Sequence, residues 1–150
     1  DLYEDYDGNR YSHACPVRRI VEDGLVSGEN IIQIGIRAAT REQIDFAKKE
    51  GIKMITASQV FKGKEIHVPF TKAYISFDMD VLDPAFAPGV GNPEPGGLST
   101  RELVEIINAL DAKLVSFDIV EVNPHYDYSD ITSFAAAKLI KEVLSHSMGF

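Results

Sequence analysis

Two aspartates, Asp78 and Asp80, follow an apolar stretch that has the composition of a buried strand. Side chains alternate between the two faces of an extended backbone, so these carboxylates are predicted to point the same way. Two carboxylates on one face repel each other unless a cation lies between them. Hard divalent cations such as Mg²⁺ and Mn²⁺ prefer oxygen ligands of this kind. The Asp-x-Asp spacing is consistent with a metal site, although phosphotransferases and solvated loops share it.

A third carboxylate, Glu121, directly follows the apolar segment 114–120. Ligands of open parallel sheets bind beyond the carboxyl ends of the strands, which is where Glu121, like Asp78 and Asp80, is expected to lie. Asp118 lies within the same segment and is predicted to be a buried, hydrogen-bonded carboxylate that supports the Glu121 loop. Considered alone, Glu121 is better explained as a solvated side chain at a strand end.

The segments that must position these carboxylates show two alternating kinds of hydrophobic pattern. Runs rich in β-branched residues predict strands, whereas periodic segments that begin at capping residues predict helices. Strands are expected at 31–36, 52–56, 74–77 and 114–120, and helices at 16–23, 41–50, 100–110 and about 130–147. This alternation predicts an α/β fold with a mostly parallel sheet flanked by helices on both faces. Residues 57–72 show no clear pattern.

Particular residues mark the helix boundaries and one long loop. Thr40 and Ser99 are predicted N-caps, and each is followed three residues later by Gln43 or Glu102 in a capping-box arrangement. Residues 83–97 contain four prolines and four glycines, a density that excludes any regular element. This segment is predicted to be a long, rigid loop that shapes the wall of a pocket.

The composition limits the class of partner. Fifteen Lys and Arg against 23 Asp and Glu give the 150 residues a net charge of −8, which argues against nucleic acid or an anionic membrane as the main partner. The apolar runs are too short to span a bilayer. Cys15 is the only cysteine, so no disulfide framework is possible within the chain and a reducing cytoplasm is the expected compartment. Cys15 itself is predicted to be a small packing residue.

A longer pattern is far more specific than the Asp-x-Asp spacing. From Ser76 the chain reads SFDMDVLDPAFAPGVGNPEPGG, which resembles the signature of the ureohydrolase superfamily of arginases, agmatinases and their relatives. The segment DIVEVNP, from Asp118, is similar to the guanidinium-binding segment of that family. Upstream, Asp1 and the later GNRYSH resemble the stretch that follows the family's Asp-Ala-His-x-Asp metal motif. The GNRYSH loop and the segment EVNPHYD resemble agmatinases more closely than arginases.

The resemblance implies a role for each candidate residue. In the family, two Mn²⁺ ions share a bridging hydroxide, and Asp78 would bridge the metals while Asp80 and Asp1 would each bind one of them. Glu121 would pair with the substrate guanidinium, since a carboxylate matches that planar donor group through charge-assisted hydrogen bonds. His13 would transfer a proton to the leaving amine.

The reaction implied by the resemblance is the hydrolysis of agmatine to putrescine and urea. Arginase, guanidinobutyrase and formimidoylglutamase activities stay open as alternatives. Three upstream metal ligands of the family have no counterpart in the sequence, so residues 1–150 are expected to be the C-terminal portion of a single arginase-like domain, or a non-catalytic fragment or partner. The resemblance also implies a homo-oligomer, trimeric or hexameric.

Overall fold

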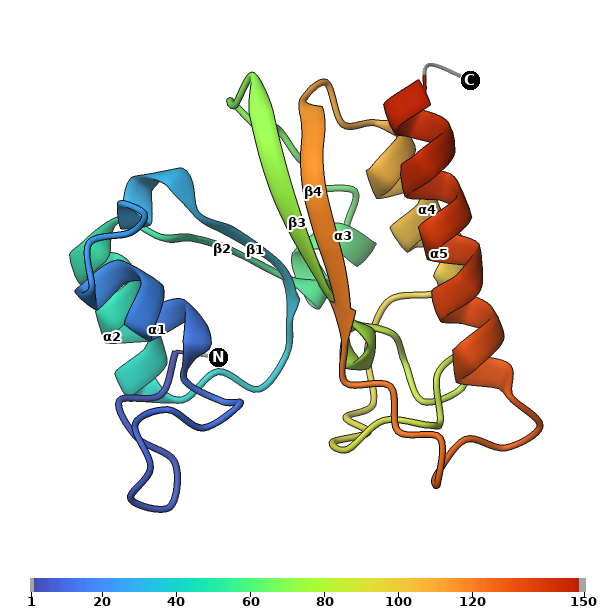
Figure 1. The fold of residues 1–150 in the computed structure, drawn as a ribbon, viewed down its shortest axis with the longest axis horizontal. Coiled ribbons are helices and arrows are strands. Elements are labelled where there is room, and N and C mark those ends of the chain that lie inside the picture. Colours follow the sequence, from blue (N-terminus) through green and yellow to red (C-terminus); the bar gives the residue numbers. More distant parts are fainter. Residues whose placement is uncertain (1, 149–150) are drawn as a thin grey trace. The chain divides into compact units, whose positions relative to one another are not determined.

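The computed structural model describes residues 2–148, and its helices and parallel strands form the predicted α/β fold (Figure 1). The chain divides into two compact units, residues 1–56 and residues 57–150, which we describe separately. Among the helices of the described residues, none combines the length and the apolar character needed to cross a bilayer.

The first unit contains one parallel strand pair and its helices. Strands β1 and β2 pair in parallel, with Ile34 opposite Ile55, and the register shifts at Gly35, whose φ of +88° is a conformation that glycine adopts without strain. Its elements are α1 (Pro16–Glu22), the 3₁₀ turn η1 (Gly28–Asn30), β1 (Ile32–Ile36), α2 (Arg41–Glu50) and β2 (Lys53–Thr56). Cys15 is completely buried, which confirms its predicted packing role.

The second unit carries the predicted strand-end carboxylates. Strands β3 and β4 pair in parallel, and Asp78 lies opposite Val120, so both strands end at the same edge. The elements are α3 (Ala57–Phe61), β3 (Lys72–Asp78), the 3₁₀ turn η2 (Met79–Val81), α4 (Thr100–Asn108), β4 (Lys113–Val120) and α5 (Ile131–Met148). Helix α3 lies in the stretch for which the sequence showed no pattern.

Local capping signals position the helices as predicted. Thr40 and Gln43 form a complete capping box at the start of α2, and Ser99 and Glu102 form another at the start of α4. Helix α5 begins one residue after Asp130, close to its predicted start. Its first amide groups are bonded by a carboxylate further upstream, which is described with the site.

The core of the second unit lies between the sheet and two helices. Helices α4 and α5 pack side by side over one face of β3 and β4 (Figure 1). Between them lie Phe77, Met79, Ile107, Leu139 and Val143, all at most 5% exposed. Burial of these side chains fixes the strands on which the candidate site residues stand.

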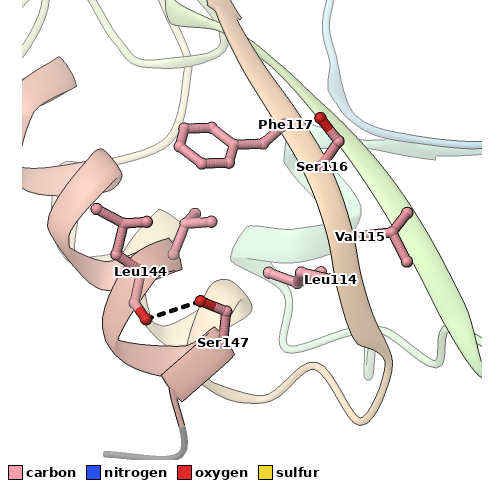
Figure 2. A pocket seen from close by; sticks show the side chains of 7 residues that line it. Leu114, Val115, Ser116, Phe117, Leu144 and Ser147 are labelled. Carbon is pink, nitrogen blue, oxygen red and sulfur yellow. Dashed lines mark hydrogen bonds between the residues drawn. The ribbon is translucent and has the colours of Figure 1, made fainter.

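A pocket lies between β4 and α5 (Figure 2). Phe117 of β4 and Leu144 of α5 face it, and the Ser147 hydroxyl donates a hydrogen bond to the Leu144 carbonyl at 2.8 Å. On β4 the pocket is lined by Leu114 to Phe117, whereas Glu121 follows the end of that strand. It is thus separate from the strand-end carboxylates.

Candidate functional site

Asp78 ends β3 and at the same time begins the turn that follows. Its Oδ1 accepts a hydrogen bond from the backbone N–H of Asp80 at 3.1 Å, so Asp78 is the N-cap of η2. The prediction that Asp78 and Asp80 share one face of an extended strand is therefore wrong. The carboxylate bends the chain out of the strand one residue before Asp80, because this short side-chain bond competes with the extended backbone. The completely buried Met79 anchors the turn in the core.

The charge around Asp78 is strongly unfavourable to its ionised form. Burial and, after it, the negative charge of Asp80 raise the pKa of Asp78 to about 7, and Glu121 contributes in the same direction. The hydrogen bond from the Asp80 amide opposes this rise without cancelling it. A cation near these carboxylates would reduce the repulsion between them. The negative charge at this place therefore suits a metal ion or a guanidinium group.

Glu121 directly follows β4 and has an unusual backbone. Its φ is +65°, in the left-handed region that few residues other than glycine adopt. Such a conformation persists only where the surrounding structure enforces it, and it is concentrated at functional sites. Gly91, in the long loop, lies close by, because a Cβ placed on it would be 3.5 Å from Oε2 of Glu121. The Glu121 carboxylate thus stands beside the Pro/Gly-rich loop, as expected for a pocket wall.

The loop of residues 83–97 is held by backbone groups and one carboxylate. Asp83 accepts hydrogen bonds from the amides of Ala85 at 2.9 Å, Gly96 at 2.7 Å and Gly97 at 3.2 Å. No helix or strand forms in this described segment, which confirms the prediction from its prolines and glycines. The bonds to Asp83 join the beginning of the loop to its end.

A second anchor joins this loop to the start of α5. Gly89 packs so closely on Asp127 that a Cβ at Gly89 would lie 2.5 Å from the Asp127 Cβ. Asp127 in turn accepts hydrogen bonds from the amides of Thr132 and Ser133, both at 2.9 Å, which lowers the pKa of Asp127 although desolvation acts to raise it. The carboxylate thereby bonds the otherwise unpaired amides at the helix start.

We expect Gly89→Ala to destabilise the protein by about 2 kcal/mol or more. The added methyl group would overlap Asp127 and force the loop away from α5, and overpacking of this kind typically costs about 1–3 kcal/mol. Urea denaturation measures the free energy of unfolding. Gly63→Ala is the control for glycine removal, since its positive φ of +76° brings backbone strain without any nearby atom. Equal stability losses in both variants would contradict the packing argument.

Asp118 links the two strands of the second unit. Its Oδ1 accepts a hydrogen bond from the Ser76 hydroxyl at 2.7 Å, and its other oxygen accepts one from the Tyr74 hydroxyl. This hydrogen bond and partial burial raise the pKa of Tyr74. The predicted hydrogen-bonded carboxylate is confirmed, although Asp118 is only partly buried. The bond between Ser76 and Asp118 joins β3 and β4 two positions before Asp78 and Val120.

His13 lies in an ordered loop of the first unit. The two ends of this loop meet where the Tyr3 amide donates to the Ala14 carbonyl at 3.2 Å, and Tyr6 pairs with Asn9 within it. The His13 ring is exposed and makes an edge contact with the Tyr6 ring at a centroid distance of 5.5 Å.

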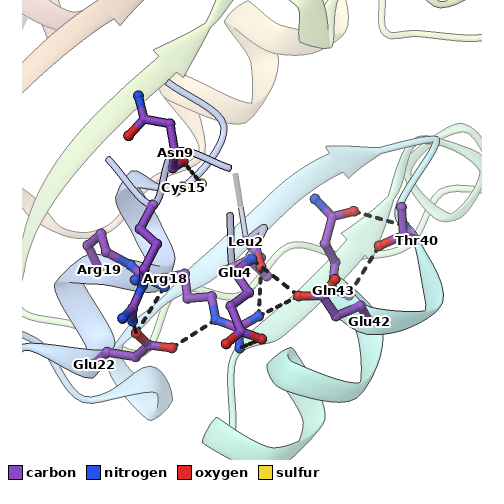
Figure 3. A network of polar contacts seen from close by, with 11 residues as sticks. Leu2, Glu4, Asn9, Cys15, Arg18, Arg19, Glu22, Thr40, Glu42 and Gln43 are labelled. Carbon is purple, nitrogen blue, oxygen red and sulfur yellow. Dashed lines mark hydrogen bonds and ion pairs between the residues drawn. The ribbon is translucent and has the colours of Figure 1, made fainter. Parts of the chain in front are cut away.

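Arg18 ties the beginning of this loop to two helices (Figure 3). Its guanidinium donates to Glu22 at 2.8 Å, to Glu42 at 2.7 Å and to Glu4 at 3.3 Å, and it stacks 4.4 Å above the Phe46 ring. The Arg18 side chain is only 11% exposed, so these partners compensate its burial. The network explains why the loop is ordered despite its lack of apolar periodicity.

The donor set suits a metal only in part. Asp78 and Asp80 supply the carboxylate oxygens that a hard divalent cation prefers, and their mutual repulsion favours its binding. Across residues 2–148, however, the structure does not bring three or more His, Cys, Asp or Glu side chains together at one point. Asp1, the third predicted ligand, lies outside the described residues. Two of the three predicted metal ligands are thus adjacent, and a complete site needs further donors.

The residues that join the long loop to α5 are absent from the sequence-based site. Gly89, Asp127 and Thr132 contact one another directly, yet they lie up to 43 positions apart in the chain. Asp127 lies shortly before the first residue of α5, Ile131. An aspartate at the start of a helix is compatible with a capping role. No local signal indicates its contact with Gly89.

Comparisons with known proteins identify the family. The model of the arginase family matches residues 1–145. The agmatinase of Halalkalibacterium halodurans is 40% identical over 149 residues, which are 96% of this chain and 51% of the relative. The mitochondrial arginase of Medicago truncatula is also 40% identical, over 95% of this chain and 44% of the relative. Among solved structures, proclavaminate amidino hydrolase from Streptomyces clavuligerus superimposes with a TM-score of 0.88 and 34% identity, covering 97% of this chain and 52% of that one.

The α/β fold is thus that of arginases, agmatinases and their relatives. The chain belongs to the arginase family. It spans about half the length of the curated relatives it matches. Agmatinases and arginases match equally well, so overall similarity does not decide the substrate.

Proposed function

We propose that the protein takes part in the hydrolysis of agmatine to putrescine and urea. The observation that carries this proposal is the Glu121 carboxylate, which follows β4 and interacts with Asp78 across the paired strand ends. A carboxylate at this place is suited to a guanidinium, because the two planar groups form parallel charge-assisted hydrogen bonds. The nearby Asp78 and Asp80 supply the oxygen ligands for the metal that the family resemblance implies.

In this proposal Asp78, Asp80 and Asp1 would hold Mn²⁺. A bound divalent ion lowers the pKa of water and so supplies a nucleophile at neutral pH. Glu121 would bind and orient the guanidinium group of the substrate through charge-assisted hydrogen bonds. Residues 1–150 would be the C-terminal portion of a single arginase-like domain. The remaining metal ligands would come from the part of that domain that the chain does not span.

The sequence resemblance favours agmatine over arginine. The segments GNRYSH and EVNPHYD resemble those of agmatinases more closely than those of arginases. Agmatine lacks the α-carboxylate of arginine, so its enzyme needs no group that binds this carboxylate. We therefore propose agmatine as the preferred substrate.

His13 is proposed to protonate the leaving amine. If so, His13→Ala should lower kcat about 100-fold near neutral pH and leave KM nearly unchanged, because general acid catalysis contributes about 10²–10⁴-fold. The pH profile of kcat measured with agmatine should also lose one of its ionisations. His146→Ala, on α5, is the control and should behave like the wild type. An unchanged kcat in His13→Ala across neutral pH would remove the role.

Substrate comparison tests the proposal directly. The full-length protein, loaded with Mn²⁺, should release urea from agmatine with a kcat/KM at least about tenfold above that for arginine, a difference of about 1.4 kcal/mol. A preference for arginine or 4-guanidinobutyrate would overturn the agmatine assignment and keep the ureohydrolase class. Absence of hydrolysis with all guanidino and formimidoyl substrates would favour the non-catalytic alternative. Cytoplasmic location and trimeric or hexameric assembly stay predictions from the sequence.

A further inference from the structure

The left-handed backbone conformation of Glu121 requires contacts with other residues that maintain it. A φ of +65° at a residue with a long side chain is unfavourable in a free loop, which would relax to an ordinary conformation. The position of the Glu121 carboxylate depends on this backbone, because relaxation would rotate the side chain away from its present direction. The residues that enforce the conformation are therefore part of how Glu121 is presented.

The two residues after Glu121 are bonded to the long loop. The Asn123 amide donates to the Gly89 carbonyl at 2.7 Å, and Val122 forms a β-bridge with Val90. These contacts fix the chain immediately beyond the left-handed residue. Gly89 and Val90 can thus hold the segment that follows Glu121 if the loop that carries them is itself held in place.

A buried hydrogen bond joins Gly89 to Thr132. The Gly89 amide donates to the Thr132 hydroxyl oxygen at 2.7 Å, and Thr132 is completely buried at the start of α5. The Thr132 hydroxyl also bonds the Asp127 carboxylate, against which Gly89 packs. One continuous series of contacts therefore runs from the core helix α5 through Gly89 and Asn123 to Glu121.

We propose that Thr132 is a positioning residue for Glu121, which it orients through Gly89 and Asn123. Thr132 does not touch substrate in this proposal, which rests on the role proposed above for Glu121. A threonine that only stabilised α5 would affect the stability of the protein without affecting how tightly the guanidino substrate binds. The two cases are distinguishable because they predict different measurements.

The decisive variant is Thr132→Val, which keeps the shape of the side chain and removes its oxygen. The buried Gly89 amide then loses its acceptor, and the Gly89–Asn123 contact should loosen. We expect KM for agmatine to rise about tenfold with kcat changed by less than about twofold, since only the orientation of Glu121 is disturbed. Hydrogen exchange at the Asn123 amide should become at least about tenfold faster. Thr132→Ser should restore both values.

Ser133→Ala is the matched control. The Ser133 hydroxyl bonds Asp127 at 2.9 Å, as the Thr132 hydroxyl also bonds it, but it does not bond Gly89. An equal rise of KM in Ser133→Ala would show that the effect arises from the Asp127 cap and would overturn the proposal. Unchanged exchange at Asn123 in Thr132→Val would also overturn it. If Thr132→Val does not fold, Thr132→Ala tests the same loss with a smaller side chain.

The exchange measurement separates this inference from the proposed function. It requires neither metal nor substrate, so it reports on the contacts between Thr132 and Asn123 even if agmatine proves not to be a substrate. Faster exchange together with absent agmatine hydrolysis would refute the proposed function and keep the positioning contact. Normal exchange at the Asn123 amide in a Thr132→Val enzyme that hydrolyses agmatine would refute the positioning contact and keep the proposed function.

Discussion

Asp78→Asn is expected to abolish urea release and to weaken Mn²⁺ binding by more than about 100-fold. Even the hydrogen-bonded partners of metal ligands typically account for about 10–100-fold in affinity, and Asp78 is proposed as a metal ligand itself. The amide keeps the size of the side chain and an oxygen that can accept the Asp80 amide at the turn. Metal content after dialysis and initial rates with agmatine measure the effect. Asp111→Asn, on an exposed residue before β4, is the control.

The same variant has an expected signature in the metal-free protein. The pKa of Asp78 is raised to about 7, so its contribution to folding is present at acid pH and is lost as the pH rises through 7. An asparagine carries no charge, and the metal-free variant should therefore be at least as stable as the wild type at pH 8. Thermal unfolding of both metal-free proteins at pH 5 and pH 8 gives the comparison. A variant that is inactive because it is unfolded would show a lower Tm at both pH values.

Glu121→Gln is expected to raise KM for agmatine by about 100-fold or to abolish turnover. A hydrogen bond to a charged partner contributes about 1.5–3 kcal/mol, and each 1.4 kcal/mol is tenfold in binding. Glutamine has the same shape and retains one acceptor, so the loss reports the charge of the pair. The variant should also make the Asp78 carboxyl easier to ionise, because Glu121 raises its pKa.

Glu94→Gln, on an exposed residue of the long loop, controls for the loss of one negative charge in Glu121→Gln. It should leave KM within about twofold of the wild type, since an exposed charge is screened by solvent. Unaltered kinetics in Glu121→Gln would remove the guanidinium-binding role. An equal KM rise in Glu94→Gln would instead indicate a general effect of protein charge.

Much of this fold is predictable because its signals are local. The capping boxes at Thr40 and Ser99 consist of residues three positions apart, and the structure contains both. The prolines and glycines of residues 83–97 likewise act on their own backbone. The family pattern around Asp78 and Glu121 identified the strand ends where the carboxylates stand.

Features that depend on competing or distant contacts were not predictable in the same way. Asp80 does not continue the strand, because its backbone amide donates to the Asp78 side chain and the strand ends at Asp78. Glu121, with its left-handed backbone, precedes Val122 and Asn123, whose contacts are with Val90 and Gly89, remote in the chain. No alternation or capping signal encodes such contacts, because they arise only when loop and helix pack together.

The measurement that tests the central claim most directly is the Mn²⁺-dependent release of urea from agmatine by the purified full-length protein. Urea and putrescine should appear in equal amounts, disappear after removal of metal by a chelator and return when Mn²⁺ is added. Glu121→Gln should show little of this activity at low agmatine concentration. Urea release that is unaffected by chelation, or the absence of urea from a folded and metal-loaded protein, would contradict the account.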